Sequence, residues 1–234
     1  MGAEPEPRVA IVVAARNEAE GIATTLDALA GAFPGAAIWV ADDASTDETA
    51  PIAMQHGARV VSRGRSHGKG GNVTATCEAM LSDPERADVV LLCDADLGES
   101  ARQLTGLVDA LRGDCDLAIA VFARRVGGGL GIAVGSARWS IRRATGREMR
   151  APISGQRAMR SRVLRDVLPF AAGFGMETGM TIDAVRADHR VCEVELDLEH
   201  RATGRTVGGF AHRGRQARDI LRAYAARRRG GDRG

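Results

Sequence analysis

Lysine is almost missing from this 234-residue chain: among its 32 basic residues only Lys69 is a lysine, and the others are arginine. The ammonium of lysine is a compact point charge, whereas the guanidinium of arginine is a wide, planar fork. Arginine therefore supplies nearly all the positive charge of this chain. The single lysine indicates a position at which a compact ammonium matters.

Long apolar runs are missing as well. No run approaches the ~18 residues that a membrane-spanning helix needs. The N-terminal stretch before Val9 is short, acidic and rich in proline, so it does not resemble a signal peptide. It also lacks the Ser or Thr of a myristoylation signal. We therefore expect a cytoplasmic protein.

Cysteine is scarce and unpaired in the sequence. The four cysteines lie at positions 77, 93, 115 and 192, and none of them is in CxxC spacing. Cys93 lies inside an apolar run. This pattern predicts buried free thiols and argues against disulfides and against a zinc site.

The net charge is only +2, but it is unevenly distributed. Residues 201–234 contain ten arginines against Asp219 and Asp232, a net +8 without histidine, which leaves −6 for the other 200 residues. A basic end on an acidic body favours an anionic partner near the C-terminus. A solvated helix face followed by a frayed end would give the same pattern, so both interpretations stay open.

The first half of the chain alternates between two kinds of segment. Short apolar runs rich in β-branched residues predict buried strands over residues 8–14, 36–41, 58–62, 88–93 and 116–123. Capping residues and glycines delimit helices over about residues 18–31, the first of them capped by Asn17, then 45–56, 72–82 and 100–112. This alternation predicts an α/β fold, with a mostly parallel sheet and helices on both faces.

The alternation stops after residue 124. A glycine-rich connector leads to further elements, which we expect at residues 132–144 (amphipathic), 153–160 (strand), 176–187 (helix), 190–197 (strand) and 210–228 (helix). No internal repeat and no linker separates these parts. With 44% apolar residues, the chain fits one domain with one core, whose second half is elaborated.

Charged side chains follow four predicted strands at their carboxyl ends, which is where a parallel sheet binds its ligands. In strand order they are Arg16 and Glu18, Asp42 and Asp43, Lys69, and Asp94 and Asp96. Solvated loops would also be polar, but they need not place paired carboxylates directly after buried strands. The pattern therefore favours one site at this edge of the sheet.

Asp94 and Asp96 give the sharpest chemical signal. Alternate carboxylates at a strand end can both approach one hard cation, and Mg²⁺ and Mn²⁺ prefer oxygen ligands, including those of phosphate. In a transfer from a diphosphate, such a metal would neutralise the charge that develops on the leaving nucleotide. Helix capping is the alternative; it fits Asp96 but leaves Asp94 unexplained.

Two other segments suit a nucleotide. A carboxylate of Asp42 or Asp43 can accept hydrogen bonds from a nucleobase imide or a ribose hydroxyl. The loop from Gly64 to Gly71 resembles a phosphate cradle, because glycines let backbone N–H groups approach an anion. It is not a Walker loop, since position 63 is Arg and position 70 is Gly.

As an ordered set, these segments resemble the GT-A glycosyltransferases of family 2, and most closely the polyprenyl-phosphate (dolichol) sugar synthases and the glucosyl-3-phosphoglycerate synthases. The segments are Ala14-Ala15-Arg16-Asn17-Glu18, Asp42-Asp43-Ala44-Ser45-Thr46-Asp47, Gly68-Lys69-Gly70 and Asp94-Ala95-Asp96. The family usually has Pro at position 14 and Gly at position 44. The resemblance covers about residues 8–205 and implies a GT-A (Rossmann-like) sheet.

The resemblance divides the chain and assigns roles. It implies a flexible N-terminus (1–7), a nucleotide-sugar-binding half (8–124), an acceptor-binding half (125–208) and a basic C-terminal helix and tail (209–234). The implied donor-binding residues are Ala14, Arg16, Glu18, Asp42, Asp43, Lys69, Asp94, Ala95 and Arg124. The implied metal ligands for Mg²⁺ or Mn²⁺ are Asp96, Asp94 and His200.

On the acceptor side, the resemblance implies binding by Ser154, Gly155, Gln156 and Arg201. Glu177 lies in a segment that resembles the one with an acidic residue near the acceptor. There it would orient the acceptor or act as general base, and with Asp96 it forms the expected catalytic pair. Because Glu177 opens a predicted helix, favourable helix-end electrostatics is the alternative role.

The leading hypothesis is therefore a metal-dependent glycosyltransferase, with UDP-glucose taken as the donor. Its acceptor would carry phosphate, because five arginines crowd the acceptor-side segment: Arg138, Arg142, Arg143, Arg147 and Arg150. Both a polyprenyl phosphate and a small phosphorylated metabolite fit. One helical face, comprising Ala217, Ile220, Leu221 and Tyr224, would suit a membrane surface or a packed core.

Two other classes stay open. A sugar-phosphate nucleotidyltransferase shares the sheet and the metal, but it would place a glycine-rich basic loop directly after the first strand. A non-catalytic nucleotide-sugar-binding module would not need Asp94, Asp96 and Glu177 together. We expect no nucleic-acid partner, and a homodimer is left open.

Overall fold

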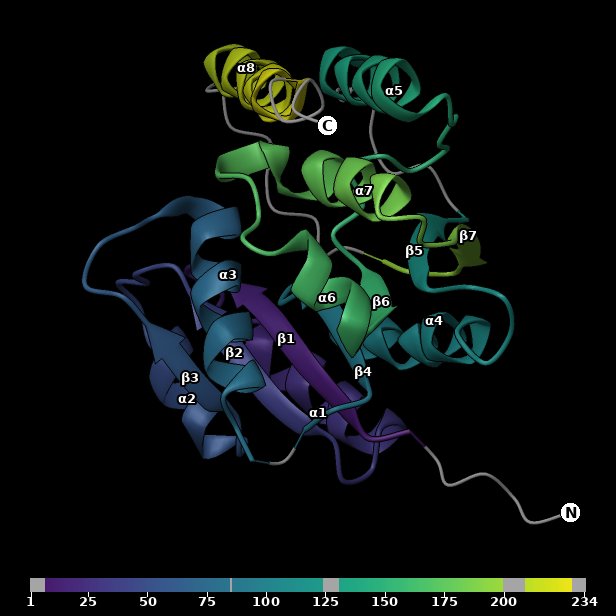
Figure 1. Cartoon of the computed structure of the whole chain (residues 1–234). Helices are drawn as coiled ribbons and strands as arrows, with labels where there is room; N and C mark the ends of the chain where they lie inside the picture. The colour runs from purple at the N-terminus through teal and green to yellow at the C-terminus, as the bar shows by residue number, and fades with distance from the viewer. Residues whose placement is uncertain (1–6, 85, 124–130, 200–208, 229–234) are drawn as a thin grey trace, which may run out of the picture.

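One mixed sheet organises the residues that the computed structural model describes, which are 7–84, 86–123, 131–199 and 209–228. Its strand order is β3-β2-β1-β4-β6-β5-β7 (Figure 1). The strands are β1 (Val9–Ala15), β2 (Ala37–Asp42), β3 (Arg59–Ser62), β4 (Val89–Asp94), β5 (Leu117–Phe122), β6 (Arg157–Arg160) and β7 (Val191–Leu196). All run parallel except β6, which is antiparallel to β4 and β5. The predicted α/β fold with a mostly parallel sheet is confirmed.

Helices cover both faces of the sheet. Helix α1 (Ile22–Ala32), the 3₁₀ helix η1 (Gly98–Leu104) and α4 (Thr105–Ala110) cover one face, with α2 (Thr49–Gln55) beside β3. Helices α3 (Gly68–Leu81), α6 (Ser161–Val167) and α7 (Met176–Arg186) cover the other face, which the 3₁₀ turn η2 (Gly173–Gly175) also borders. Helices α5 (Gly131–Thr145) and α8 (Gly209–Arg228) form an outer layer on α7 (Figure 1).

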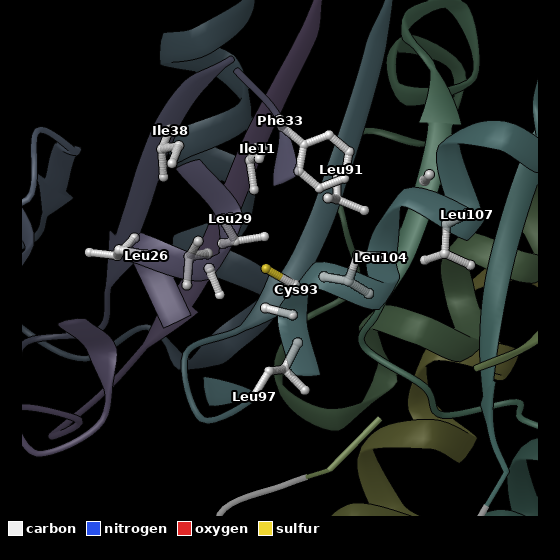
Figure 2. Close-up of a cluster of buried hydrophobic side chains, with 14 of the residues drawn as sticks. Ile11, Leu26, Leu29, Phe33, Ile38, Leu91, Cys93, Leu97, Leu104 and Leu107 are labelled. Atoms are coloured by element: carbon white, nitrogen blue, oxygen red, sulfur yellow. The ribbon is translucent and has the colours of Figure 1, made fainter. Parts of the chain in front are cut away.

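The core lies on both sides of the sheet because successive strand residues point to opposite faces. In β1, Ile11 belongs to the cluster under α1, whereas Val12 belongs to the cluster under α3. Figure 2 shows the first cluster, where Leu29 of α1 and Leu104 of η1 meet the strand residues. Strands buried on both faces need near-continuous apolar runs, and this is the pattern that the sequence has.

Several helices begin at other residues than the sequence predicts; helix α2 begins at Thr49 rather than at residue 45. Helix α1 begins at Ile22, and Asn17 does not cap it; Asn17 has φ 55° and accepts a hydrogen bond from the Thr46 N–H at 2.9 Å. Asn17 therefore joins the turns after β1 and β2. Helix α3 begins at Gly68, four residues earlier than predicted, so Lys69 lies in its first turn rather than in a loop.

The prediction that disulfides are absent is wrong. Cys115 and Cys192 form a disulfide with their Cα atoms 6.0 Å apart. The two residues are 77 positions apart, and they meet because β5 and β7 are neighbours in the sheet. Cys77 and Cys93 are free and buried as predicted, and burial raises the pKa of both thiols.

The apolar face of α8 is packed inside the protein. Ile220, Ala223 and Tyr224 are buried, and Tyr224 makes an edge contact with Trp139 of α5 at 5.2 Å between ring centroids. This burial favours the packed-core interpretation for most of the face and leaves Leu221 44% exposed. Among the described residues, no helix is long and apolar enough to span a membrane.

Candidate active site

Four strands end at one rim of the sheet and bring their polar residues together. The parallel register pairs Ala14 with Asp94 on one side and with Ala41 on the other. A pocket of about 590 Å³ opens at this rim. Of the predicted donor-site residues, it is lined by Ala14, Arg16, Glu18, Asp43, Lys69, Asp94 and Ala95, together with the predicted metal ligand Asp96. A larger hollow, of about 720 Å³, lies at the opposite edge near Pro34 and has no paired carboxylates in its lining.

Lys69 forms the centre of the pocket. Its Nζ lies 2.6 Å from Asp94 Oδ1 and 3.0 Å from Glu177 Oε1. Burial alone would lower the pKa of this ammonium, but the two carboxylates outweigh burial and raise the pKa above its ordinary value. Lys69 is therefore a permanent cation between the end of β4 and the start of α7.

Glu177 is buried in the first turn of α7, with its side chain 8% exposed. A carboxylate is favoured there by the partial positive charge of the helix end. The contact with Lys69 adds an ion pair to that helix-end role. The proposed catalytic carboxylate thus faces the donor pocket across a single ammonium group.

The segment from Ser154 to Gln156, which is predicted to bind the acceptor and is called the acceptor-side segment below, contacts the same centre. Gln156 Nε2 donates to Asp94 Oδ2 at 2.8 Å, and Ser154 Oγ donates to Gln156 Oε1 at 3.2 Å. A Cβ on Gly155 would come within 2.5 Å of Lys69 Nζ and 2.8 Å of Asp94 Oδ2. The segment therefore packs closely against the ion pair, and a Cβ at position 155 would require the side chains of Lys69 and Asp94 to shift.

Arg157 anchors this segment from below. The side chain is fully buried, and it donates to the Ser154 carbonyl at 2.8 Å and to Thr181 Oγ1 of α7 at 2.9 Å. Burial lowers the pKa of its guanidinium to about 10, although the charges of Glu177 and Glu193 act in the opposite direction. Arg157 ties the acceptor-side segment to the helix that carries Glu177.

Asp43 holds the loop before α3 in place. It accepts hydrogen bonds from Ser66 Oγ at 2.7 Å and from the His67 N–H at 2.9 Å, and Arg16 Nη1 lies 3.5 Å away. These hydrogen bonds fix the loop beside Asp43, which lines the pocket. The predicted phosphate-binding loop runs from Gly64 to Gly71. In the structure, Gly68 to Gly71 belong to α3 instead of the loop.

Three predicted donor residues have structural contacts as well. Asp42 is 2% exposed, is absent from the pocket lining, and accepts hydrogen bonds from Ser62 Oγ and the Ser45 N–H. The N–H of Glu18 donates to Thr49 Oγ1, and that of Ala95 donates to the Ala14 carbonyl. Arg124, His200 and Arg201 lie outside the described residues.

The acidic residues suit a divalent cation in part. Asp94 and Asp96 line one pocket, and a carboxylate oxygen that accepts one hydrogen bond keeps a further lone pair for a metal. Asp94 contacts Lys69 and Gln156 with its two oxygens, and Asp96 lines the same pocket. Within the described part of the chain, no group of three His, Cys, Asp or Glu side chains converges.

Several pocket residues were missed by the sequence analysis. Asn72 lies in the pocket lining, three residues after Lys69 on α3, and this helical spacing was the available signal. Phe174 and Asp219 also line the pocket. Asp219 comes from α8, and a Cβ on Gly173 would lie 2.5 Å from its Oδ2, so no local pattern could place it there.

This geometry agrees with comparisons to known proteins. The family model described as "Glycosyl transferase family 2" matches residues 10–174, which include the polar residues of every strand end above. The chain belongs to glycosyltransferase family 2. Membership decides between the three classes that the sequence left open, and it makes the chain a glycosyltransferase.

Relatives of this family 2 glycosyltransferase span nearly its whole length. An undecaprenyl-phosphate mannosyltransferase of Micrococcus luteus is 31% identical over 214 residues, which cover 84% of this chain and 86% of that protein. Solved structures of glucosyl-3-phosphoglycerate synthase from Mycobacterium tuberculosis have a TM-score of 0.75 at 25–26% identity, and cover 94% of this chain and 80% of theirs. One of them holds Mn²⁺, UDP and glucosyl-3-phosphoglycerate, and another holds Mg²⁺ and UDP. The expected GT-A fold is confirmed.

Proposed function

We propose that this enzyme transfers a hexose, with glucose from UDP-glucose as the leading candidate, to an acceptor that carries phosphate. One observation carries the proposal: Asp94, Asp96 and Lys69 share a pocket, and Glu177 meets Lys69 at 3.0 Å. Acidic residues at one end and an ammonium at the centre suit a diphosphate with its divalent cation. The UDP complexes of the mycobacterial structures support the choice of nucleotide.

The metal would be Mg²⁺ or Mn²⁺, held by Asp96 and Asp94, with His200 as the proposed third ligand. When bound, such a cation neutralises the charge that develops on the leaving diphosphate. Lys69 supplies a fixed positive charge beside it, since its partners keep it protonated. Glu177 lies 3.0 Å from this ammonium, and it orients the acceptor or accepts the proton of an acceptor hydroxyl.

The acceptor needs separate argument, because most of the arginines expected to bind it contact the protein itself. Arg138 donates to the carbonyls of Met149 and Arg150, and Arg147 donates to the carbonyl of Val191. Arg142 pairs with Glu148, and Arg150 pairs with Glu195. The fifth arginine, Arg143, is exposed and stays a phosphate-binding candidate together with Arg201.

The outer surface of α5 and α8 supports a polyprenyl phosphate. Ile132 is 69% exposed, Trp139 is 53% exposed and Leu221 is 44% exposed. The same two helices carry the exposed Arg143 and Arg222. Apolar and aromatic side chains among arginines suit the surface of an anionic membrane. The Micrococcus relative, which is named for a polyprenyl phosphate, agrees with this choice.

Transfer assays test the proposal directly. Purified enzyme would receive labelled UDP-glucose or GDP-mannose, with Mn²⁺ or EDTA, and either undecaprenyl phosphate in anionic vesicles or phosphoglyceric acid in solution. We expect metal-dependent transfer to one acceptor, with the lipid favoured. Transfer that persists fully in EDTA would remove the metal from the proposal, and transfer to neither acceptor would remove the acceptor class.

A binding measurement isolates the metal ligand. In a thermal-shift panel with Mn²⁺, UDP and GDP, the best nucleotide should stabilise the wild-type protein, because it binds only the folded state. Asp96→Ala should abolish the part of this stabilisation that depends on metal. An unchanged shift in the variant would exclude Asp96 as a ligand.

A further inference from the structure

Asn72 lines the donor pocket on the same helix as Lys69, one turn further along. It is only 1% exposed. Among the described residues, neither its Oδ1 nor its Nδ2 has a hydrogen-bond partner. Buried amides in folded proteins are almost always hydrogen-bonded, since a buried group without a partner loses its bonds to water and gains nothing. An amide with two unpaired atoms in a binding pocket therefore indicates a partner that arrives with the ligand.

The chemistry of the amide limits what that partner can be. A carboxamide presents one acceptor oxygen beside an amino group that donates. A diphosphate offers acceptors only, so it would satisfy Nδ2 and leave Oδ1 unpaired. The hydrogen-bonding edge of a nucleobase offers a donor next to an acceptor and can satisfy both atoms at once.

The charged pocket residues near Asn72 already contact other groups of the protein. Lys69 is engaged by Asp94 and Glu177 at the charged centre of the pocket. Asp43 accepts hydrogen bonds from Ser66 and from His67, the residue before α3. Asp43 thus fixes the start of the helix whose next turn carries Asn72. Asn72 lines the pocket, and its two buried amide atoms have no partner among the described residues.

We propose that Asn72 is a specificity-determining residue, which pairs with the donor–acceptor edge of the nucleobase in the sugar donor. This inference rests on the proposed function, because it assumes that a nucleotide occupies the pocket. The amide is held without partners until the base enters. The unpaired amide destabilises the free enzyme, and nucleotide binding removes this destabilisation. Asn72 therefore discriminates between bases through the hydrogen bonds that each base can make with it.

Two variants and one control test the proposal. Asn72→Leu keeps the approximate volume and removes both polar atoms, whereas Asn72→Asp keeps the shape and removes the donor. Ser140→Ala is the matched control, because Ser140 Oγ is another buried atom without a partner among the described residues, on α5 and outside the pocket lining. Calorimetry with Mn²⁺ would give the Kd of each protein for UDP, GDP, CDP and inorganic pyrophosphate.

We expect Asn72→Leu to weaken the best nucleotide about tenfold or more and to flatten the preference among the three bases, since a lost pairing of two hydrogen bonds has this size. Pyrophosphate should bind to this variant within about twofold of wild type, because it has no base. Asn72→Asp should lose affinity most for the base whose acceptor faced Nδ2. Ser140→Ala should change none of these constants.

A second readout separates a binding role from a structural one. If the amide is unpaired in the free enzyme, Asn72→Leu should unfold at the same temperature as wild type or a higher one, while it binds the nucleotide less tightly. A lower unfolding temperature with an unchanged base preference would instead mean that the amide supports the fold, and it would overturn the proposal.

Other results also overturn it. Equal losses for all three nucleotides would indicate a ribose contact, and an equal loss for pyrophosphate would indicate a diphosphate contact. Should the leucine variant not fold, Asn72→Asp decides alone, since an unchanged ranking of bases contradicts base pairing. Sugar transfer that persists with the same base preference in the variants refutes only this inference. Failure of the wild type to bind any nucleotide refutes the proposed function as well.

Discussion

Lys69 Nζ lies 3.0 Å from Glu177 Oε1, and this ion pair joins the first turn of α3 to the first turn of α7. The same ammonium lies 2.6 Å from Asp94 Oδ1 at the end of β4. One cation thus bridges the carboxylates of Asp94 and Glu177. The sequence prediction that the only lysine has a special place agrees with this position, because a compact group fits between the two acids.

Lys69→Met should lower both activity and stability. We expect kcat/KM to fall about 100-fold, the usual loss when one fixed electrostatic partner of a transition state is removed. The free energy of unfolding should fall by about 2–3 kcal/mol, because Glu177 would stay buried without its partner. Steady-state kinetics and urea unfolding measure the two effects.

Lys69→Arg is the informative partner of that variant. It keeps the charge but replaces a compact ammonium with a wide fork beside Gly155, where a single added carbon would already meet Lys69 Nζ at 2.5 Å. We expect activity well below wild type. Full activity in Lys69→Arg would show that any cation suffices at this position.

Gly155→Ala should lower the transfer rate through steric crowding alone. The added Cβ would meet Lys69 Nζ at 2.5 Å and Asp94 Oδ2 at 2.8 Å, so either the segment or the ion pair must move. A shift of about 1 Å in a catalytic group can lower the rate about 100-fold. Transfer assays on the purified variant, with circular dichroism to confirm folding, measure this loss.

Gly135→Ala provides the matched control. Gly135 lies inside α5, and a Cβ there would meet nothing within 4 Å. Alanine is the better helix former by about 1 kcal/mol, so this variant should be fully active and slightly more stable. If Gly155→Ala were as active as Gly135→Ala, the close packing around Lys69 would not matter for catalysis.

Much of the donor site could be predicted from the sequence because chain order determines it. In a parallel sheet the carboxyl ends of all strands lie at one rim, so residues directly after the strands share that rim whatever the strand order. Asp43, Asp94 and Asp96 needed only the correct assignment of two strands. The predicted strand boundaries were accurate enough for this, since a buried strand is a short and sharply bounded apolar run.

The remaining contacts depend on strand order and packing, which periodicity does not encode. Glu177 meets Lys69 because antiparallel β6 enters the sheet between β4 and β5 and brings the following helices over the rim. Cys115 and Cys192 meet because β7 pairs with β5. Asp219 reaches the pocket from the C-terminal helix. None of these pairs has a spacing in the sequence that would reveal it.

The disulfide between Cys115 and Cys192 should stabilise the fold without serving the reaction. It closes a segment of 77 residues, and crosslinks of this kind contribute about 2–4 kcal/mol. We expect the variant with both Cys115→Ser and Cys192→Ser to unfold at a lower temperature than wild type. Its kcat should be unchanged, because the bond lies near the first residues of β5 and β7, whereas the site lies at the carboxyl ends.

Reduction of the wild-type protein supplies the control. Dithiothreitol should lower its unfolding temperature to that of the double variant, and it should have no effect on the variant itself. A kcat that falls with the disulfide would mean that the bond also holds the site in shape.

Asp116 should make the stability depend on pH below about pH 4. Burial acts to raise the pKa of this carboxyl, but the Arg190 N–H at 2.9 Å and the charge of Arg162 outweigh it and lower the pKa. The pKa in the unfolded chain is about 3.9, so the stabilisation is fully present above that value and is lost as pH falls through it towards the folded pKa. Asp116→Asn should therefore unfold about 2 kcal/mol more easily at pH 7, and the difference should shrink below about pH 4.

Asp114→Asn is the matched control. Asp114 pairs with Arg190 at 2.9 Å, but its side chain is 91% exposed, so the change should cost under about 0.5 kcal/mol at any pH. Urea unfolding of the three proteins at pH 7, 4 and 3 measures this, and a constant difference between Asp116→Asn and wild type down to pH 3 would mean that the carboxylate charge is not what stabilises the fold.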